Sequence, residues 1–394
     1  MVRDVVIVSA CRTPVGRFLG TLAEIPAVKL GGVAIAEAVR RAGLDPGEID
    51  EVIVGNVLQA GQGQNPGRLA LHAAGLPDEV PAVTVNKLCG SSMKALHFAV
   101  QAITCGDADA IVAAGMESMS LAPYLLAKAR TGYRMGDGTL EDHLLRDGLM
   151  CAVNDYHMGV TAENVAERYG ISREDQDVFA FESQRRAGAA LAAGVFKDEI
   201  VPVAIPQKKG DPKLFDTDEH PRPDTTMADL AKLRPAFRKD GTVTAGNSSG
   251  VNDAAAALVV TSRGFAEKRG LKPLARVVGY ASAALDPAYM GMGPYHATLK
   301  VMEKTGMTLD QMDLIELNEA FAAQSLAVIR ELDVDVSRTN VSGGALALGH
   351  PIGCSGARIL TTLLYGLLRT GGRYGLATMC IGGGQGVATI IEAE

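Results

Sequence analysis

Short apolar runs rich in β-branched residues alternate along the chain with longer segments in which apolar residues recur at helical spacing. This alternation predicts strands and helices layered in a parallel α/β arrangement. The expected strands of the first part are Val5–Val8, Val52–Gly55, Ala82–Asn86 and Ala110–Ala114. Those of the last part are Arg276–Tyr280, Leu314–Leu317, Thr339–Ser342, Gly375–Thr378 and Val387–Ile391.

The two groups of strands follow the same plan. In each group an acidic residue leads into a strand that ends in an asparagine, Asn56 in the first and Asn318 in the second. About thirty residues beyond each asparagine, a glycine-rich turn opens a helix, and this turn carries Cys89 in the first group and His350 in the second. Such internal similarity predicts a duplicated α/β unit. The alternative is that α/β segments resemble one another in general, and at this point it stays open.

Between the two units the composition changes. Met, Tyr, Pro and charged residues become more frequent, and Pro202–Pro223 is rich in turn formers. We expect residues 121–247 to form an inserted loop domain. It would lie between an N-terminal half of residues 1–120, to which about 248–270 return, and a C-terminal half of residues 271–394. Within the insertion, Thr161–Ala193 predicts a strong helix whose start at Ser172 has a capping-type sequence.

Composition narrows the class of partner. A chain of 394 residues with 47% hydrophobic content can bury a large core, and its formal charge of −7 argues against a broad nucleic-acid footprint or attachment to an anionic membrane. We therefore expect small-molecule partners. No run approaches the roughly 20 apolar residues of a membrane span, and no charged leader precedes the first apolar segment, so we expect a cytoplasmic protein. A mature organellar protein whose leader was removed is the alternative. The six cysteines form no C-x-x-C pair, and we predict no metal site.

Cys89 lies where an apolar strand stops and a helix with apolar positions Met93, Leu96, Val100 and Ile103 begins. Free amides and the positive end of the helix dipole at such a position lower the pKa of a thiol and favour the thiolate. A nucleophilic cysteine and a buried apolar cysteine are both compatible with this segment alone.

His350 lies in a glycine-rich loop, Ser342–Arg358, in which Pro351 fixes the chain after the histidine and a helix starts near Cys354. A lone histidine is more often structural than catalytic. The matching position of the repeat, however, carries Cys89. If a pseudo-twofold axis relates the halves, the two turns meet and give a nucleophile and base pair.

Two further segments carry candidate chemistry. Cys380 precedes a glycine run that is followed by a strand, so the run cannot be a dinucleotide-binding loop, which must open a helix. Its free backbone N–H groups instead suit an oxyanion hole. The segment Asn318–Phe321 closes its strand with an amide that can hold a water or an oxyanion, or cap a helix.

Taken together, these segments resemble the thiolase family over nearly the whole chain. The motifs in order are Asn86–Ala95, Asn318–Phe321, Gly343–Arg358 and Cys380–Gly386. The resemblance implies a duplicated, five-layered αβαβα core with an inserted loop domain. It also implies that Cys89 takes the acyl group, that His350 activates it, and that Cys380 is the acid/base. One oxyanion hole would be His350 with a water held by Asn318, and the other the amides of Cys89 and Gly382.

The resemblance also implies how coenzyme A thioesters bind as substrates, without a separate cofactor. A short-chain, acetoacetyl-CoA type of pocket is implied by His157, Met158 and Met290. The basic stretch Lys232, Arg234, Arg238 and Lys239 suits nucleotide phosphates, with a merely solvated face as the alternative. The residues expected to bind substrate or coenzyme A are Leu149, His157, Met158, Arg222, Phe237, Ala245, Gly246, Ser249, Met290, Ala320 and Phe321.

The predicted activity is the reversible condensation of two acetyl-CoA molecules. The alternatives are a degradative thiolase for longer 3-ketoacyl chains and, from another class, a silent thioester-binding protein. A ketoacyl synthase of the same fold would not need Cys380. Segment Leu121–Leu145 resembles a tetramerisation loop, so we expect a homotetramer. Three residues depart from the family pattern and put local packing in doubt, namely Ser92, Ser342 and Cys354.

Overall fold

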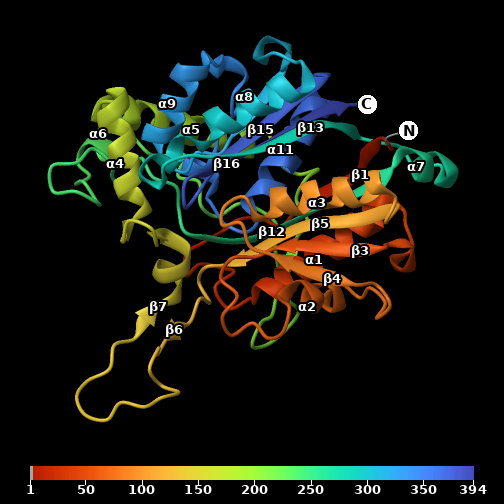
Figure 1. The fold of residues 1–394 in the computed structure, drawn as a ribbon, viewed down its shortest axis with the longest axis horizontal. Coiled ribbons are helices and arrows are strands. Elements are labelled where there is room, and N and C mark those ends of the chain that lie inside the picture. The colour runs from red at the N-terminus through yellow and green to blue at the C-terminus, as the bar shows by residue number, and fades with distance from the viewer. Residues whose placement is uncertain (1–2) are drawn as a thin grey trace.

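The computed structural model describes residues 3–394, and within them ten strands form one sheet (Figure 1). The order of the strands is β14-β15-β16-β13-β1-β12-β5-β3-β4, with β2 paired to β12. Their bounds are β1 Val5–Arg12, β2 Gly16–Arg17, β3 Glu51–Gly55, β4 Ala82–Val85, β5 Ala110–Ser118, β12 Asn252–Ser262, β13 Ala275–Ala284, β14 Leu314–Leu317, β15 Tyr374–Ile381 and β16 Gln385–Ala393.

The sheet consists of two similar halves that meet at a short contact between β1 and β13. This contact pairs Val6 with Arg276 and Ile7 with Ala275. In the first half β3 and β5 are parallel, and β12 lies antiparallel to β5. In the second half β14 and β15 are parallel, and β16 lies antiparallel to β15. The predicted duplication of an α/β unit is therefore confirmed.

Helices cover both outer faces of the sheet halves and fill the space between them (Figure 1). Helices α1 and α2 pack on the first half, α8 on the second, and α3 and α11 lie between the two. This is the five-layered αβαβα arrangement expected from the sequence. The bounds are α1 Ala27–Ala42, α2 Pro66–Ala73, α3 Ser91–Cys105, α7 Arg263–Arg269, α8 Gly293–Thr305, α9 Ala322–Leu332, α10 Ala345–Leu348 and α11 Ser355–Thr370.

The two central helices approach closely at their N-terminal ends. A Cβ atom on Gly356 of α11 would lie 2.5 Å from the backbone nitrogen of Met93 in α3, so only glycine fits there. Leu96 of α3 and Leu360 of α11 are fully buried in the same hydrophobic core. Because Cys89 and His350 precede these helix ends, the packing of α3 on α11 brings both turns to one place.

The predicted strand Thr339–Ser342 is wrong. Only Thr339 bridges the sheet, opposite Ile315 of β14, in the position that β4 occupies beside β3 in the first half. The chain leaves the extended conformation at Asn340, whose φ is 46°. The Asn340 side chain takes over the pairing, since its Oδ1 accepts from Leu317 N and its Nδ2 donates to Leu317 O. The Asn340 side chain therefore makes the hydrogen bonds to β14 that a further strand would make at this edge of the sheet.

Strand β12 was absent from the predicted strands. It pairs with β1 on one side and β5 on the other, and all of its residues are buried. Its segment Ala254–Ala257 consists of four alanines, which favour helices and show no polar alternation. Burial on both faces removes the alternation by which a half-buried strand is recognised.

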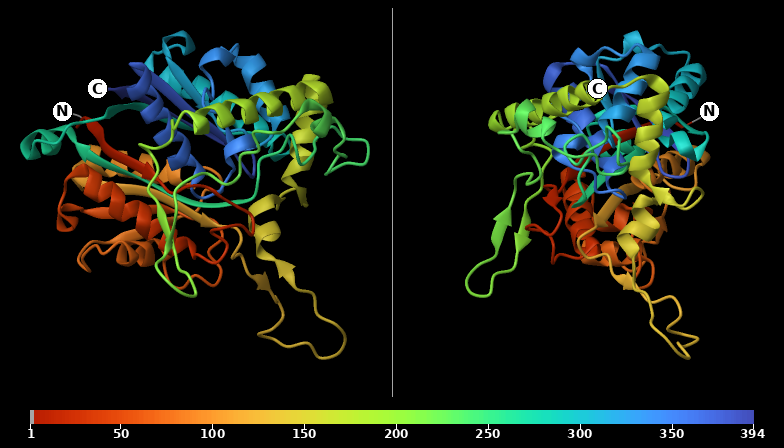
Figure 2. Two further views of the ribbon diagram at one scale, coloured as in Figure 1. Left: turned by 180° about the vertical axis from the view of Figure 1, so that it is seen from behind. Right: turned by 90° about the vertical axis from the view of Figure 1, so that its left-hand side faces the viewer.

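The inserted segment wraps one side of the molecule and sends out two projections (Figure 2). One is the loop between β6 and β7, and the other is the β10–β11 hairpin. The predicted helix start at Ser172 is confirmed, because its hydroxyl accepts from Asp175 N at 3.0 Å. The bounds are β6 Tyr124–Leu125, β7 Glu141–Asp142, β8 Met150–Cys151, β9 Tyr156–His157, α4 Met158–Tyr169, α5 Arg173–Ala192, β10 Val203–Ile205, β11 Lys213–Phe215 and α6 Met227–Ala231.

Short helical turns complete the chain, at η1 Pro46–Glu48, η2 Leu144–Leu149, η3 Pro287–Met292, η4 Leu309–Gln311 and η5 Val336–Arg338. Across residues 3–394, every helix falls short of the length and apolar character that crossing a lipid bilayer requires.

Candidate functional site

Turns from both halves of the molecule line one cavity of about 380 Å³. Cys89 lies between β4 and α3, and His350 lies between α10 and α11. Cys380 is the last residue but one of β15, two residues before Gly382. All four line the cavity. The structure therefore brings the two thiols and the imidazole together.

The turn at Cys89 is tightly built. Leu88 adopts a positive φ of 48°, and a Cβ atom on Gly90 would lie 2.4 Å from Ile381 Cδ1. The N–H groups of Gly90 and Ser91 donate to Lys87 O and Leu88 O, within the turn itself. The amides that begin α3 are thus engaged and do not all face the sulfur.

The expected lowering of the Cys89 pKa is wrong. Burial raises the pKa of the Cys89 thiol to about 11, although the backbone N–H groups of Gly382 and of Cys89 itself act in the opposite direction. The charge of Glu117 adds to the rise. In the absence of substrate Cys89 is therefore a protonated thiol.

The hydrogen bonds around His350 fix the tautomer of its ring. Its Nδ1 lies 2.6 Å from Ser355 Oγ, and the Ser355 hydroxyl donates to Pro351 O at 2.9 Å. Because a serine hydroxyl has one proton, Oγ accepts from Nδ1–H, which leaves Nε2 unprotonated. Nε2 is buried and has no hydrogen-bond partner within residues 3–394. Burial, together with the charge of Arg358, lowers the pKa of His350 to about 3, so the free ring is neutral.

Cys380 is more deeply buried than Cys89 and is fully enclosed in the core. Burial is the main reason why the pKa of its thiol is raised above the ordinary value, and the charge of Cys89 adds to the rise. A thiolate formed at Cys380 is consequently a strong base.

Asn318 follows β14 and is 1% exposed. Its backbone N–H donates to Thr378 O, but neither side-chain atom has a hydrogen-bond partner within the described residues. The neighbouring Glu319 carboxylate accepts from Ser183, Asn340 and Leu346. Asn318 does not itself line the cavity, so its unpartnered amide would reach a substrate through a water.

Most residues expected to contact substrate line the cavity. The list comprises Leu149, His157, Met158, Arg222, Phe237, Ala245, Ser249, Met290, Ala320 and Phe321. Three aromatic rings pack against one another along one wall. The His157 ring stacks on Phe237 with ring centroids 4.7 Å apart, and Phe237 meets Phe321 edge to face with centroids 6.1 Å apart. Gly246 lies outside the lining, and a Cβ atom there would meet the side chains of Leu230 and Leu233.

The cavity also has walls that sequence reasoning missed, formed by Leu88, Met119, Gly148, His220, Ala236, Ser248, Gly250, Val251 and Ile352. Several are neighbours of predicted residues, and that proximity was the available signal. His220, for example, stands two residues before Arg222. Within residues 3–394 no three His, Cys, Asp or Glu side chains gather as a metal site requires.

The three departures from the family pattern lie in packed positions. Ser92 Oγ accepts from Ala357 N at 2.9 Å and so ties α3 to α11. Ser342 is buried, and Cys354 is fully buried away from the cavity lining. Burial raises the pKa of the Cys354 thiol to about 12, so this third thiol is protonated and enclosed.

Comparison with known protein families agrees with this geometry. Residues 5–264 match the family described as thiolase, N-terminal domain, and residues 271–393 match thiolase, C-terminal domain. The chain belongs to the thiolase family. It is therefore an acyltransferase, and the two thiols and the imidazole lie in the cavity of a thiolase.

Relatives of this thiolase match it from end to end. It is 60% identical to an acetyl-CoA acetyltransferase of Pseudomonas aeruginosa, with all of both chains covered. It is 56% identical to an acetyl-CoA acetyltransferase of Escherichia coli, with 99% of each chain covered. Among solved structures, the Bacillus anthracis acetyl-CoA acetyltransferase superposes on it with a TM-score of 0.98 at 46% identity, covering 100% of this chain and 99% of the other.

Proposed function

We propose that this thiolase is an acetyl-CoA C-acetyltransferase, which joins two acetyl-CoA molecules into acetoacetyl-CoA and coenzyme A and also catalyses the reverse thiolysis. The observation that carries the proposal is the convergence of Cys89, His350 and Cys380 on one cavity. The printed names of the relatives, acetyl-CoA acetyltransferases over their full length, support the choice of substrate.

In the first half-reaction the Cys89 sulfur attacks the carbonyl carbon of acetyl-CoA, and its proton passes to His350 Nε2. Since the thiol pKa is about 11 and the free imidazole is neutral, proton transfer accompanies the attack. The thioester C–S bond breaks, and the Cys380 thiol protonates the departing coenzyme A sulfur. The products are acetyl-Cys89, coenzyme A, an imidazolium at His350 and a thiolate at Cys380.

In the second half-reaction the Cys380 thiolate removes an α-proton from the next acetyl-CoA. Its raised pKa supports this role, because a basic thiolate is needed against a weak carbon acid. The resulting carbon nucleophile attacks acetyl-Cys89, the bond to the Cys89 sulfur breaks, and His350 returns its proton to that sulfur. All three side chains are then restored, with acetoacetyl-CoA as the second product.

Two donor pairs would stabilise the oxygen charges of these steps. The amides of Cys89 and Gly382 form one pair, and their effect on the Cys89 pKa supports their orientation toward the site. The other pair is the protonated Nε2 of His350 with a water held by Asn318. The unpartnered, buried side chain of Asn318 supports this second pair.

We propose that coenzyme A lies along the wall formed by the loop domain and the residues that directly follow it. Arg222 and Ser249 supply polar groups, and Phe237 with His157 supplies an apolar surface for the pantetheine chain. Gly246 contributes by letting Leu230 and Leu233 approach rather than by direct contact. Lys232, Arg234 and Lys239 are exposed and suit the nucleotide phosphates. Arg238 is half-buried and donates to Glu167 and Asn164 instead.

Met158 and Met290 line the cavity beside Cys380 and Phe321. We place the acyl group of the substrate against these two methionines, which supports a short-chain substrate. The alternative is a degradative enzyme for longer 3-ketoacyl chains. Rates of thiolysis on acetoacetyl-CoA and 3-ketodecanoyl-CoA separate the two. Our proposal predicts a higher kcat/KM on acetoacetyl-CoA, and a clear preference for the longer substrate would contradict it.

We further propose that the enzyme is a cytoplasmic homotetramer that acts in fatty acid metabolism. The projection between β6 and β7 stands out from the body of the molecule (Figure 2). It supports the assembly, because apolar side chains of this segment are exposed, among them Tyr124, Leu140 and the almost fully exposed Met135. Sedimentation velocity of the full chain tests this, with Met135→Asp expected to give dimers. A wild-type monomer or dimer would contradict it.

A further inference from the structure

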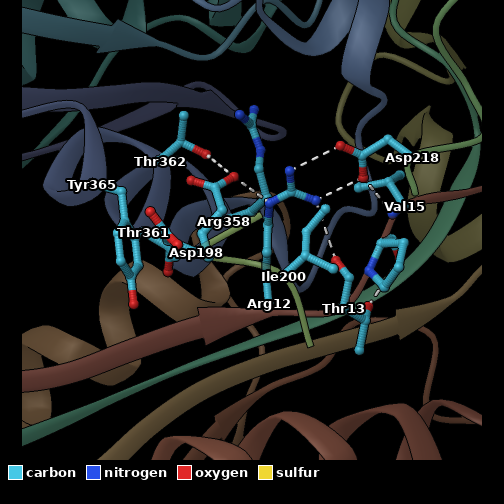
Figure 3. Close-up of polar contacts among 12 residues, drawn as sticks. Arg12, Thr13, Val15, Asp198, Ile200, Asp218, Arg358, Thr361, Thr362 and Tyr365 are labelled. Carbon is cyan, nitrogen blue, oxygen red and sulfur yellow. Dashed lines mark hydrogen bonds and ion pairs between the residues drawn. The ribbon is translucent and has the colours of Figure 1, made fainter. Parts of the chain in front are cut away.

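A buried arginine that does not line the cavity anchors the segment leading to one of its walls. Arg12, at the end of β1, is 1% exposed. Its Nη1 and Nη2 donate to the two carboxylate oxygens of Asp218 at 2.7 and 2.8 Å, and its Nε donates to Glu199 Oε1 at 2.6 Å. Figure 3 shows the guanidinium directed at Asp218, with Val15 beside this carboxylate and Thr362 on the opposite side. Both ion pairs of Arg12 are to the inserted segment.

The Asp218 end is held by the backbone as well as by the arginine. Val15 N donates to Asp218 Oδ1 at 2.8 Å, and Glu219 N donates back to Val15 O at 2.9 Å. A bidentate ion pair out of contact with water fixes orientation as well as distance. Asp218 is therefore fixed against the end of β1, and the residues that follow it start from one defined position and direction.

His220 and Arg222 follow Asp218 by two and four residues, and both line the cavity. Their position depends on where Asp218 is held. The His220 ring packs against Gly250, where a Cβ atom would lie 2.2 Å from the ring Cε1. Burial, with the charge of Arg222, lowers the pKa of His220 to about 4, so the ring is neutral. The backbone N–H of Arg222 donates to Gln184 Oε1, which is the next attachment along the chain.

We propose that Arg12 and Asp218 are a positioning pair that sets the affinity for coenzyme A by holding His220 and Arg222 in the cavity wall. The inference rests on the proposal that this cavity binds coenzyme A. Cys89, His350 and Cys380 come from other elements. Loss of the pair therefore changes substrate binding and leaves the bond-making groups in place.

Asp218→Asn tests the pair, with Glu199→Gln as its matched control. Both changes remove one carboxylate charge from Arg12, and both carboxylates are buried. In Asp218→Asn, an amide NH₂ replaces one of the two oxygens that accept from the guanidinium. The segment around Glu199 contributes no residue to the cavity lining. Both variants are expected to lower Tm, and only Asp218→Asn is expected to act on binding.

The readout is steady-state thiolysis of acetoacetyl-CoA with coenzyme A varied. We expect Asp218→Asn to raise the KM for coenzyme A about tenfold with kcat within about twofold of wild type, and Glu199→Gln to keep KM within about twofold. An unchanged KM in Asp218→Asn, or the same increase in both variants, would overturn the proposal. If Asp218→Asn does not fold, Asp218→Glu keeps the charge, displaces the segment by one methylene and should give the same split.

A double-mutant cycle with Arg222→Ala adds a test that a general loss of stability would not satisfy. If Asp218 acts through Arg222, the KM of the double variant should not exceed that of Arg222→Ala by the full Asp218→Asn factor. A double variant whose KM increase equals the product of the two single increases would overturn the proposal. Failure of the proposed function is separate, because it would appear as a wild-type protein that forms no acetyl adduct at Cys89.

Discussion

The carboxylate of Glu117, at the end of β5, accepts a hydrogen bond from the backbone N–H of Gly353 at 2.8 Å. It also accepts from the N–H groups of Val57 and Leu58 and from Asn56 Nδ2. Each oxygen receives two N–H donors, so the buried group joins the first half of the molecule to the loop that carries His350. Glu117 is therefore one of the ties that align the two halves at the site, together with the hydrogen bond between Ser92 and Ala357.

Glu117→Gln should therefore weaken both the fold and the site. The amide NH₂ would face two N–H donors and leave them unpaired, at a cost of about 1–3 kcal/mol in the free energy of unfolding. Urea denaturation measures this loss, and kcat should fall as the His350 loop shifts. Glu51→Gln, a change of a partly buried strand carboxylate outside the site, is the control. Equal stability of the two variants would contradict the role given to Glu117.

The protonated state of Cys89 predicts how its alkylation depends on pH. With a thiol pKa of about 11, the thiolate fraction rises about tenfold per pH unit between pH 7 and pH 9. The rate of modification by iodoacetamide without substrate should rise in the same way, as followed by the mass of the peptide that contains Cys89. The exposed Cys105 serves as an internal reference for the reagent. A rate that is flat above pH 7 would mean a preformed thiolate and imidazolium pair instead.

Ser355→Ala should slow acylation through the tautomer of His350. Without the hydroxyl that accepts from Nδ1–H, the ring proton is no longer confined to Nδ1. We expect the rate of acetyl transfer to Cys89 to fall by about tenfold, measured in single-turnover experiments by rapid quench and mass spectrometry. Thr361→Ala removes another buried hydroxyl of α11 and is the matched control. A Ser355→Ala enzyme that acylates at the wild-type rate would exclude this role.

Met290→Ala should widen the acyl pocket. Met290 lines the cavity, whereas Met292, two residues on in the same turn, is buried in a separate cluster. Removing the Met290 side chain is expected to raise kcat/KM for 3-ketohexanoyl-CoA relative to acetoacetyl-CoA by about tenfold, a typical effect of space for added methylenes. Met292→Ala should leave this ratio unchanged. An unaltered ratio in Met290→Ala would remove Met290 as a determinant of chain length.

The family resemblance implied the five layers, while the repeat and the motifs were sufficient to predict the duplicated α/β unit, most strands and the turns that carry Cys89 and His350. They succeed because periodicity and glycine-rich turns are local properties of the chain. The Cys89 pKa could not be predicted, since it depends on burial and on where the Gly90 and Ser91 amides donate. Asp218 gave no signal, and His220 gave only its nearness to Arg222 in the sequence. They lie in an irregular part of the insertion, and their roles follow from contacts with the distant Arg12 and Gly250.

The central claim is that Cys89 carries the acyl group. The most direct test is the intact-protein mass after brief exposure to acetyl-CoA, for wild type and for Cys89→Ala. The account predicts a single acetyl adduct on the wild-type chain and none on the variant, with Cys354 too deeply buried to substitute. No adduct on the wild type, or an adduct that survives in Cys89→Ala, would contradict it.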